Sequence, residues 1–457
     1  MRKSTTEILG LVNVHYLLLY QTALFLCREP VRKTAARENL GGEISNTFTK
    51  NLLISSLCGV FWMARDLLEW KFDVANLFHI SLVVFSVVLE LMTESEYLEL
   101  QKSGEISKSV KFLSISVVVK TVFGVGSVYL LEEKFHVTGL VVSFVVGSLV
   151  YFFLMKNVEI KNRIRIRRLR SFGNTFWFQV QCFLKQILTE AERYIITFST
   201  ILSLSDQGVF DIVSSLAALP SRFLFQPIEE AVFQYFSKIR NSGQKHQAKI
   251  ILETCLQIVT GVAVTMAVFG EKLGAQVLNI YSGDGKLNSG VELLTGWCYY
   301  QIFIAVNGIS EAYANAFMSQ NHVKLHNLVY ILSSVAVCIT IPLAMSKDFK
   351  MVSFVLGNVA SMSVRIIWNF YVIGRDNVSF FRIVAPGLVL FFVENLFTVK
   401  FWFLVPIVQE KLGFLNSELV ELGFGAVVAG ILLGSYLVVT LLYNKRRWMP
   451  KNMLKTE

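Results

Sequence analysis

Polar side chains recur at helical spacing inside two long apolar stretches of this sequence. In residues 176–202 they fall at three- and four-residue steps, and the series is Gln181, Lys185, Thr189, Glu192, Arg193 and Thr197. In residues 209–236 similar steps place Asp211, Ser215, Arg222, Gln226, Glu229, Glu230 and Gln234. Residues at such steps share one face of a helix. A charge near the centre of a bilayer costs about 3 kcal/mol on insertion scales, so these faces are expected to contact protein or a water-filled cavity.

Other apolar stretches carry smaller groups of the same kind, namely Glu90, Lys120, Asn307 with Glu311, and Arg365. Lysine and arginine bind phosphate through charge-assisted hydrogen bonds, whereas amides and carboxylates suit sugar hydroxyls. Arg28 begins the run REPVRKTAARE, at the end of the first apolar stretch. Two interpretations of this run stay open: charge that sets membrane topology, and an entry site for a phosphorylated head group.

Two explanations of the intramembrane polar residues compete. Pairs such as Glu192 with Arg193, or Arg222 with Glu229, could simply lock neighbouring helices together. A bundle that only packs would instead rely on small residues and a few hydroxyls. The number of polar faces therefore favours a central hydrophilic cavity.

The elements that carry these faces are membrane-spanning helices. The chain has 457 residues, of which 54% are hydrophobic and only 17% charged, where a soluble chain carries about 25% charge. Apolar runs near 20 residues predict about thirteen spans in an all-α integral membrane protein. The predicted spans are 8–27, 51–70, 72–92, 110–131, 137–155, 176–202, 209–236, 250–269, 292–318, 325–344, 351–373, 381–405 and 417–443. Pro227 is expected to interrupt and kink the seventh.

Basic residues alternate between the two sides of the membrane. They concentrate in the run 156–170, KNVEIKNRIRIRRLR, and in the C-terminal KRRW. By the positive-inside rule both are cytoplasmic, which places the N-terminus on the lumenal side. The predicted organisation is a helical lobe of about five spans at 1–155, a basic cytoplasmic linker at 156–175, a lobe of six spans at 176–373, and two additional helices with a basic tail at 374–457.

Several classes of function are disfavoured. No predicted loop between spans exceeds about 25 residues, which leaves no room for a separate enzyme domain. The sequence holds no HExxH, GxxxxGK[ST] or GxGxxG motif. The six cysteines fall inside apolar runs and are interpreted as small buried hydrophobes. We therefore expect neither catalysis, a metal, a cofactor nor a nucleic-acid partner.

Long segments of the chain resemble one eukaryotic family. They are FLKQILTEAERYIITF, DQGVFDIVSSLAALPSRFLFQPIEEAVFQYFSK, GLVNVHYLLLYQTALFLCREPVRK, VVLELMTESEYL, NIYSGDGKLNSG, IAVNGISEAYANAFMS and LGNVASMSVRI. The family is Rft-one ("requiring fifty-three"), and the similarity covers nearly the whole chain in order. It implies a fold like the multidrug, oligosaccharidyl-lipid and polysaccharide exporter superfamily, with two lobes around a central cavity and two extra C-terminal helices. Members usually carry one more helix before the position of Ile8, so the first family helix is apparently missing here.

The resemblance implies transport of a dolichyl-diphosphate oligosaccharide from the cytoplasmic to the lumenal leaflet of the endoplasmic reticulum, for protein N-glycosylation. The expected partners are this glycolipid and membrane lipids, and the expected state is a monomer. The alternative is a glycolipid-binding or scaffold factor of the same pathway without transport, and an ion-coupled drug exporter ranks third. The family's recognisable motifs contain Arg28, Lys120, Lys185, Glu192, Arg193, Gln226, Pro227, Glu229 and Glu230, of which Arg28 and Glu229 are expected to be most sensitive.

Overall fold

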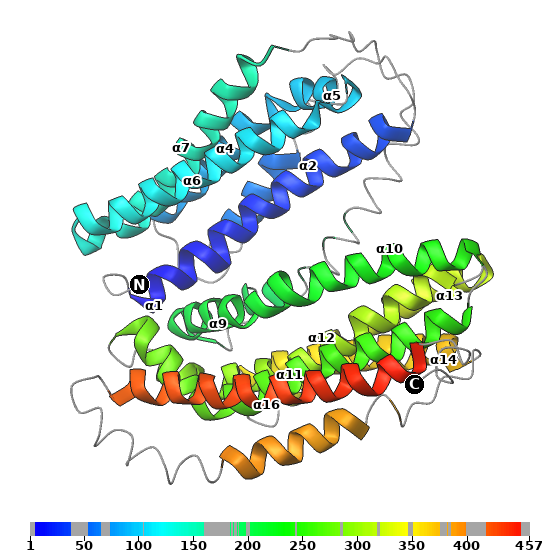
Figure 1. Cartoon of the computed structure of the whole chain (residues 1–457). Coiled ribbons are helices and arrows are strands. Elements are labelled where there is room, and N and C mark those ends of the chain that lie inside the picture. Colours follow the sequence, from blue (N-terminus) through cyan, green and yellow to red (C-terminus); the bar gives the residue numbers. More distant parts are fainter. Residues whose placement is uncertain are drawn as a thin grey trace. The chain divides into compact units, whose positions relative to one another are not determined.

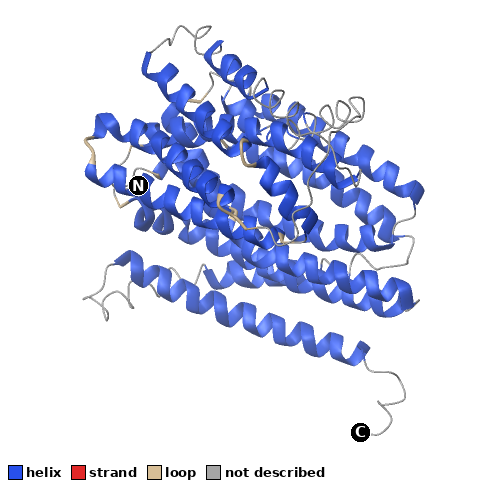
Figure 2. Ribbon diagram, turned by 90° about the horizontal axis from the view of Figure 1, so that it is seen from above, coloured by secondary structure: helices blue, strands red, loops and turns tan. Residues whose placement is uncertain are grey.

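The computed structural model describes most of the predicted spans. The described residues are 5–37, 54–64, 74–103, 105–159, 183, 186, 190, 192–197, 202–242, 245–283, 287–317, 320–345, 351–374, 382, 385–398 and 417–448. Within these ranges every regular element is a helix (Figure 1, Figure 2). Eight of the described helices are long and apolar enough to cross a membrane, and two shorter apolar helices lie at Ile54–Ala64 and Ala385–Thr398. The prediction of an all-α membrane protein is confirmed.

The chain forms two compact units, divided between Gly208 and Val209. The division falls inside α9 (Leu204–Ala217). Most of the basic linker expected at 156–175 lies outside the described residues, so the proposed organisation into lobes, linker and C-terminal helices stays a prediction.

Unit 1 begins with one continuous helical rod. It consists of α1 (Thr6–Leu9), the π-helical segment η1 (Gly10–Tyr16) and α2 (Leu17–Arg37). Further elements of this unit include α4 (Val74–Leu91), α5 (Glu94–Ser103), α6 (Ile106–Leu130), η2 (Glu133–Phe135) and α7 (His136–Lys156). Buried side chains from η1, α2, α4 and α7 form one apolar core, among them Tyr16, Leu19, Val83 and Phe144. This core fixes the helices that carry the polar residues of unit 1.

The first rod crosses the beginning of α9 at backbone contact. A Cβ added to Gly208 would lie 1.9 Å from the carbonyl oxygen of Thr6, and a Cβ added to Gly10 would lie 2.2 Å from that of Leu204. Only glycine permits so close an approach. The crossing is flanked by two hydrogen bonds: Thr6 Oγ1 lies 2.7 Å from Ser205 Oγ, and His15 Nε2 lies 2.8 Å from Gln207 Oε1.

Unit 2 is organised around one long buried helix, α11 (Lys245–Ser282). It packs against α12 (Val291–Phe317) and α16 (Ser417–Trp448), and Figure 1 shows these helices side by side. The remaining elements are η3 (Ser221–Phe225), α10 (Gln226–Ser242), η4 (Asn288–Gly290), α13 (Gln320–Met345), α14 (Val352–Gly374) and the 385–398 helix.

The span boundaries differ from the prediction at particular places. The second span is described only as Ile54–Ala64, and α11 is far longer than the predicted 250–269. In the seventh span the irregular segment lies before Pro227, at Ala218 and in η3, and a regular α-helix resumes at Gln226. The π-helical turn lies directly before the proline, whose missing N–H leaves a regular ladder incomplete.

Candidate functional site

Arg28 and Glu90 form the centre of a buried charged cluster in unit 1. Arg28 Nη2 lies 2.8 Å from Glu90 Oε2, and its Nε lies 3.4 Å from Glu94 Oε2. Side-chain exposure is 13% for Arg28 and 3% for Glu90. Arg28 occupies the later part of α2 and Glu90 the last turn of α4, so the packing of α2 on α4 brings the two charges together. Two residues predicted independently from the sequence are therefore direct partners.

Neutral donors complete the environment of the Glu90 carboxylate. The Tyr20 hydroxyl donates a hydrogen bond to Oε1, and Ser148 Oγ donates to the same oxygen at 2.9 Å. With the Arg28 guanidinium, the carboxylate thus receives donors from α2 and α7. Buried carboxylates persist when such donors and an opposite charge replace water.

A second ion pair extends this cluster by one helical turn. Arg32 Nε and Nη2 contact the two oxygens of Glu94 at 2.6 and 3.0 Å, a bidentate arrangement. The Arg32 guanidinium also lies 3.6 Å from the centre of the Tyr97 ring, within cation–π distance. Sequence reasoning did not select Arg32 or Glu94. Their i,i+4 spacing from Arg28 and Glu90 was the available signal, because such residues share a helix face.

Lys120 differs from the two arginines because its ammonium faces aromatic rings. Nζ lies 3.5 Å from the centre of the Phe144 ring and 4.9 Å from that of Tyr20. Among the described residues no carboxylate forms an ion pair with it. Gly147 lets α7 approach α6 here, since a Cβ at that position would lie 2.9 Å from Lys120 Cβ. The charged residues Arg28, Arg32, Lys120, Glu90 and Glu94 are called the Arg28–Glu90 cluster, and its basic groups exceed its carboxylates by one.

The polar face predicted at 176–202 is only partly described. Arg193 Nη1 lies 3.1 Å from Gln21 Oε1 and 3.5 Å from Glu190 Oε2. Arg193 therefore pairs with Glu190, a partner that the helix-locking interpretation did not include. Glu192 lies in the described segment 192–197, whereas Lys185 lies outside the described residues.

Unit 2 contains a separate polar cluster on three helices. Asn307 Nδ2 donates to Glu311 Oε2 at 2.8 Å, and Asn369 Nδ2 donates to Asn307 Oδ1 at 3.2 Å. The Tyr330 hydroxyl donates to Glu311 Oε1. The Arg365 guanidinium lies 4.7 Å from the centre of the Tyr330 ring. Asn307, Glu311 and Arg365 were predicted from the sequence, and α12, α13 and α14 bring them into one network.

The predicted face at 209–236 lies mainly on α10. Glu229 is half-buried, and Glu229 Oε2 would lie 2.7 Å from a Cβ added to Gly308 of α12. Gln226 Nε2 donates to Glu230 Oε1 at 3.3 Å, and both residues are exposed. Arg222 is exposed on η3, and no ion pair between it and Glu229 is present. The suggested pair of Arg222 with Glu229 is therefore wrong.

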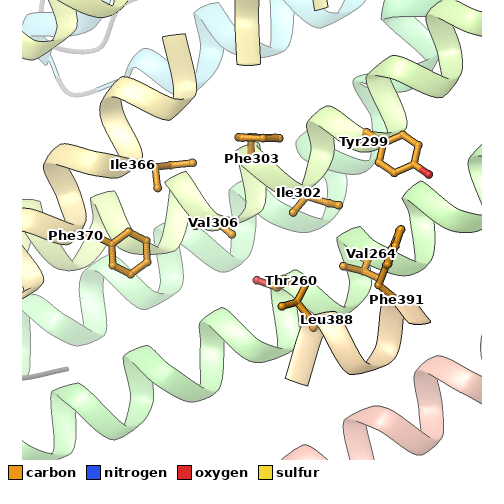
Figure 3. A pocket seen from close by; sticks show the side chains of 11 residues that line it. Thr260, Val264, Tyr299, Ile302, Phe303, Val306, Ile366, Phe370, Leu388 and Phe391 are labelled. Atoms are coloured by element: carbon orange, nitrogen blue, oxygen red, sulfur yellow. The ribbon is translucent and has the colours of Figure 1, made fainter. Parts of the chain in front are cut away.

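An apolar pocket of about 510 Å³ lies elsewhere in unit 2. Its wall is formed by Thr260 and Val264 of α11, by residues of α12 and α14, and by Leu388 and Phe391 of the 385–398 helix. Figure 3 shows these side chains surrounding the pocket, with very little polar surface among them. Sequence reasoning missed this pocket, because apolar residues in a membrane helix do not reveal which of them line a cavity.

The chemistry of these sites is recognition of charge and of hydrocarbon. The Arg28–Glu90 cluster offers cations that suit an anionic group, and the pocket suits an apolar chain. The described residues hold no group of three or more His, Cys, Asp or Glu placed to bind a metal ion.

Comparison with known proteins agrees with this fold. The family model described as "Rft protein" matches residues 1–454. Two relatives carry the name "Man(5)GlcNAc(2)-PP-dolichol translocation protein RFT1". The Xenopus tropicalis protein is 30% identical over 80% of this chain and 76% of its own length. The Caenorhabditis elegans protein is 26% identical over 93% of this chain and 89% of its own length.

Two solved structures share the fold at low sequence identity. The lipid II flippase MurJ in an inward closed conformation has a TM-score of 0.65 and 11% identity, covering 97% of this chain and 98% of its own. An inward-facing multidrug transporter of the MATE family has a TM-score of 0.58 and 11% identity, covering 81% and 90%. Fold and site define a multi-pass helical membrane protein of the architecture used by flippases and exporters. Within that class, the chain belongs to the Rft protein family.

Proposed function

We propose that this chain moves a dolichyl-diphosphate oligosaccharide from the cytoplasmic to the lumenal leaflet of the endoplasmic reticulum membrane, where the glycan serves protein N-glycosylation. The names of its relatives support this substrate, and the fold shared with a lipid II flippase supports the movement. The activity requires no cofactor or bond-breaking chemistry, so the protein acts as a transporter and not as an enzyme. The basic C-terminal KRRW supports a cytoplasmic C-terminus. We take the monomer as the functional state, with membrane lipids as its surroundings.

The observation that carries this proposal is the state of Lys120. Its ammonium is partly buried on the rings of Phe144 and Tyr20 and forms no direct ion pair with a carboxylate of the described residues, although Glu90 acts on it electrostatically. Such a cation can exchange its weak aromatic contacts for a diphosphate, which binds an ammonium more strongly in a low-dielectric site. Glu90 and Glu94 already hold the two arginines of the Arg28–Glu90 cluster, so we assign the diphosphate contact to Lys120.

The two units contribute different recognition chemistry in this proposal. The asparagine and glutamate side chains of the Asn307–Glu311 network have the donors and acceptors that sugar hydroxyls require. The apolar pocket beside the 385–398 helix suits part of a polyprenyl tail. Glu229, next to Gly308 of α12, is proposed to belong to the glycan-facing surface together with Gln226 and Glu230.

The competing function is a glycolipid-binding or scaffold factor that presents the same lipid to other proteins. Binding and movement use the same polar surfaces, so binding alone does not separate the two. The test is to reconstitute purified protein in vesicles with dolichyl-diphosphate oligosaccharide and measure the glycan that becomes accessible to an external lectin. Protein-dependent exposure of the glycan supports transport. Tight binding without exposure overturns it and favours the scaffold.

A further inference from the structure

Glu394 is a fully buried carboxyl group with one hydrogen-bond partner in the described part of the chain. It lies on the 385–398 helix with no exposed surface, inside a predicted membrane span. Oε1 lies 2.5 Å from Thr265 Oγ1 of α11, and Oε2 is buried without a hydrogen-bond partner in the described part of the chain. Leu390, on the same helix, belongs to a buried apolar cluster with Val264 and Val268 of α11, the helix that carries Thr265. In the described part of the chain, a charged carboxylate in this position would have the Thr265 hydroxyl as its one hydrogen-bond donor and no cation as a partner, fewer than buried carboxylates need.

The hydrogen bonds of Thr265 indicate where the proton lies. Thr265 Oγ1 contacts both Glu394 Oε1 and, at 3.1 Å, the carbonyl oxygen of Gly261. A hydroxyl has one hydrogen to donate, and a backbone carbonyl can only accept. Both contacts are satisfied together when Thr265 donates to Gly261 and a protonated Glu394 donates to Thr265. With this arrangement each of the two oxygen–oxygen contacts contains one hydrogen.

The titratable groups on the helices packed around the 385–398 helix have other partners. On α11, Glu271 contacts Lys272 at 2.8 Å and accepts a hydrogen bond from Tyr299 of α12. On α16, Tyr436 donates to the Gln257 carbonyl, and Glu421 accepts from Gln276. Glu253 also has a partner. The exceptions, Cys255 of α11 and Cys298 of α12, are free thiols and carry no positive charge. No described cation forms an ion pair with Glu394, so ionisation would create an uncompensated charge.

We infer that Glu394 is a proton-binding site inside the membrane, and that its proton holds the 385–398 helix against α11. Loss of the proton removes the hydrogen that Glu394 donates to Thr265, so that the Thr265 hydroxyl can no longer satisfy both Glu394 and the Gly261 carbonyl, and it places a charge between the two helices. The charge is relieved when the 385–398 helix moves away from α11 and water or lipid head groups reach it. Leu388 and Phe391 of that helix line the apolar pocket, opposite Thr260 and Val264 of α11. Deprotonation therefore opens this pocket. The inference does not depend on the transported ligand.

Infrared spectroscopy tests the protonation directly. At neutral pH the difference spectrum between the native protein and Glu394→Gln is expected to contain the carbonyl stretch of a protonated carboxyl group. In Thr265→Val this band shifts to higher frequency, because the hydrogen bond to the acid is lost. Glu421→Gln is the matched control and is expected to lack such a band in its difference spectrum. A native spectrum without a protonated band at Glu394 overturns the inference, whatever the stability of the variants.

A distance measurement tests the opening of the pocket. Spin labels at Phe392→Cys and Val277→Cys, both exposed positions, report the separation of the 385–398 helix from α11 once the native cysteines are replaced by alanine. Raising the pH is expected to lengthen this distance in the native background and to leave it unchanged in Glu394→Gln, which stays neutral. The melting temperature is a second readout. As the pH rises, the melting temperature of the native protein is expected to fall by about 4 °C relative to that of Glu394→Gln. An unchanged distance, or equal lengthening in both proteins, contradicts the inference.

Discussion

The ion pair of Arg28 with Glu90 joins the later part of α2 to the last turn of α4 at 2.8 Å, and both side chains are largely shielded from solvent. Breaking one half of a buried pair leaves the other charge uncompensated. We expect Arg28→Ala or Glu90→Ala to lower the free energy of unfolding by about 3–5 kcal/mol. Chemical unfolding in detergent measures this loss. Lys134, whose pair with Glu132 is exposed, is the control, and Lys134→Ala should change little.

A double variant distinguishes the interaction between Arg28 and Glu90 from the effect of removing each charge alone. Arg28→Met with Glu90→Gln removes both charges and keeps much of the side-chain volume, so it should be more stable than Arg28→Met or Glu90→Gln alone. Equal additive losses would show that the two residues act independently and would contradict the assigned pair.

Lys120 is predicted to affect glycolipid binding more than stability. Lys120→Met keeps an unbranched apolar stem on the Phe144 ring but loses the charge. We expect affinity for a dolichyl-diphosphate lipid to fall by about tenfold, which corresponds to ~1.4 kcal/mol, with little change in melting temperature. Lys120→Arg should retain part of the affinity. Binding to lipid nanodiscs measures both variants, and unchanged affinity in Lys120→Met would remove the diphosphate assignment.

Because the helices cross in close contact at Gly10 and Gly208, an alanine at Gly208 should destabilise the protein, whereas an alanine at a glycine with open space around it should not. Gly208→Ala places a Cβ against the Thr6 backbone, which cannot yield as a flexible side chain would, so we expect destabilisation of about 1–3 kcal/mol. Gly430 of α16 has open space around its Cβ position. Gly430→Ala should therefore be neutral or stabilising by up to ~1 kcal/mol through helix propensity. Thermal unfolding of the two variants compares them, and equal stability would contradict the close crossing.

Gly308 allows Glu229 to be tested without changing Glu229 itself. Gly308→Ala forces the end of a flexible glutamate side chain to move by a few tenths of an ångström or more, which is inexpensive for the fold. We expect nearly native stability with reduced translocation, because the Glu229 carboxylate is displaced. Glu229→Lys should abolish translocation. The lectin assay measures both, and full activity of the two variants would exclude this surface from the transport path.

The helical membrane fold could be predicted from the sequence because the thickness of the bilayer sets the length of an apolar span at about 20 residues. Basic residues in turn concentrate in the loops on the cytoplasmic side. The sequence also selected Glu90 and Lys120 as costly intramembrane charges, and Arg28 as the first residue of a basic run at the end of a span. Their grouping depends on the packing of α2, α4, α6 and α7, which the sequence pattern does not contain. Arg32 and Glu94 were missed because they lie near helix ends, where charge is ordinary. The Tyr330 hydroxyl was missed because tyrosine is also common as an apolar residue.

The most direct test of transport uses the contact between Thr6 and Ser205, whose hydroxyl oxygens lie 2.7 Å apart beside the glycine crossing. Both residues are at predicted lumenal ends of spans, so we expect this crossing to separate when glycan leaves on the lumenal side. The double variant Thr6→Cys, Ser205→Cys is oxidised in vesicles and assayed with the lectin. The account predicts translocation in the reduced protein, loss on oxidation with glycolipid binding intact, and recovery on reduction. Glycolipid binding without translocation in both the native and the reduced protein would contradict it.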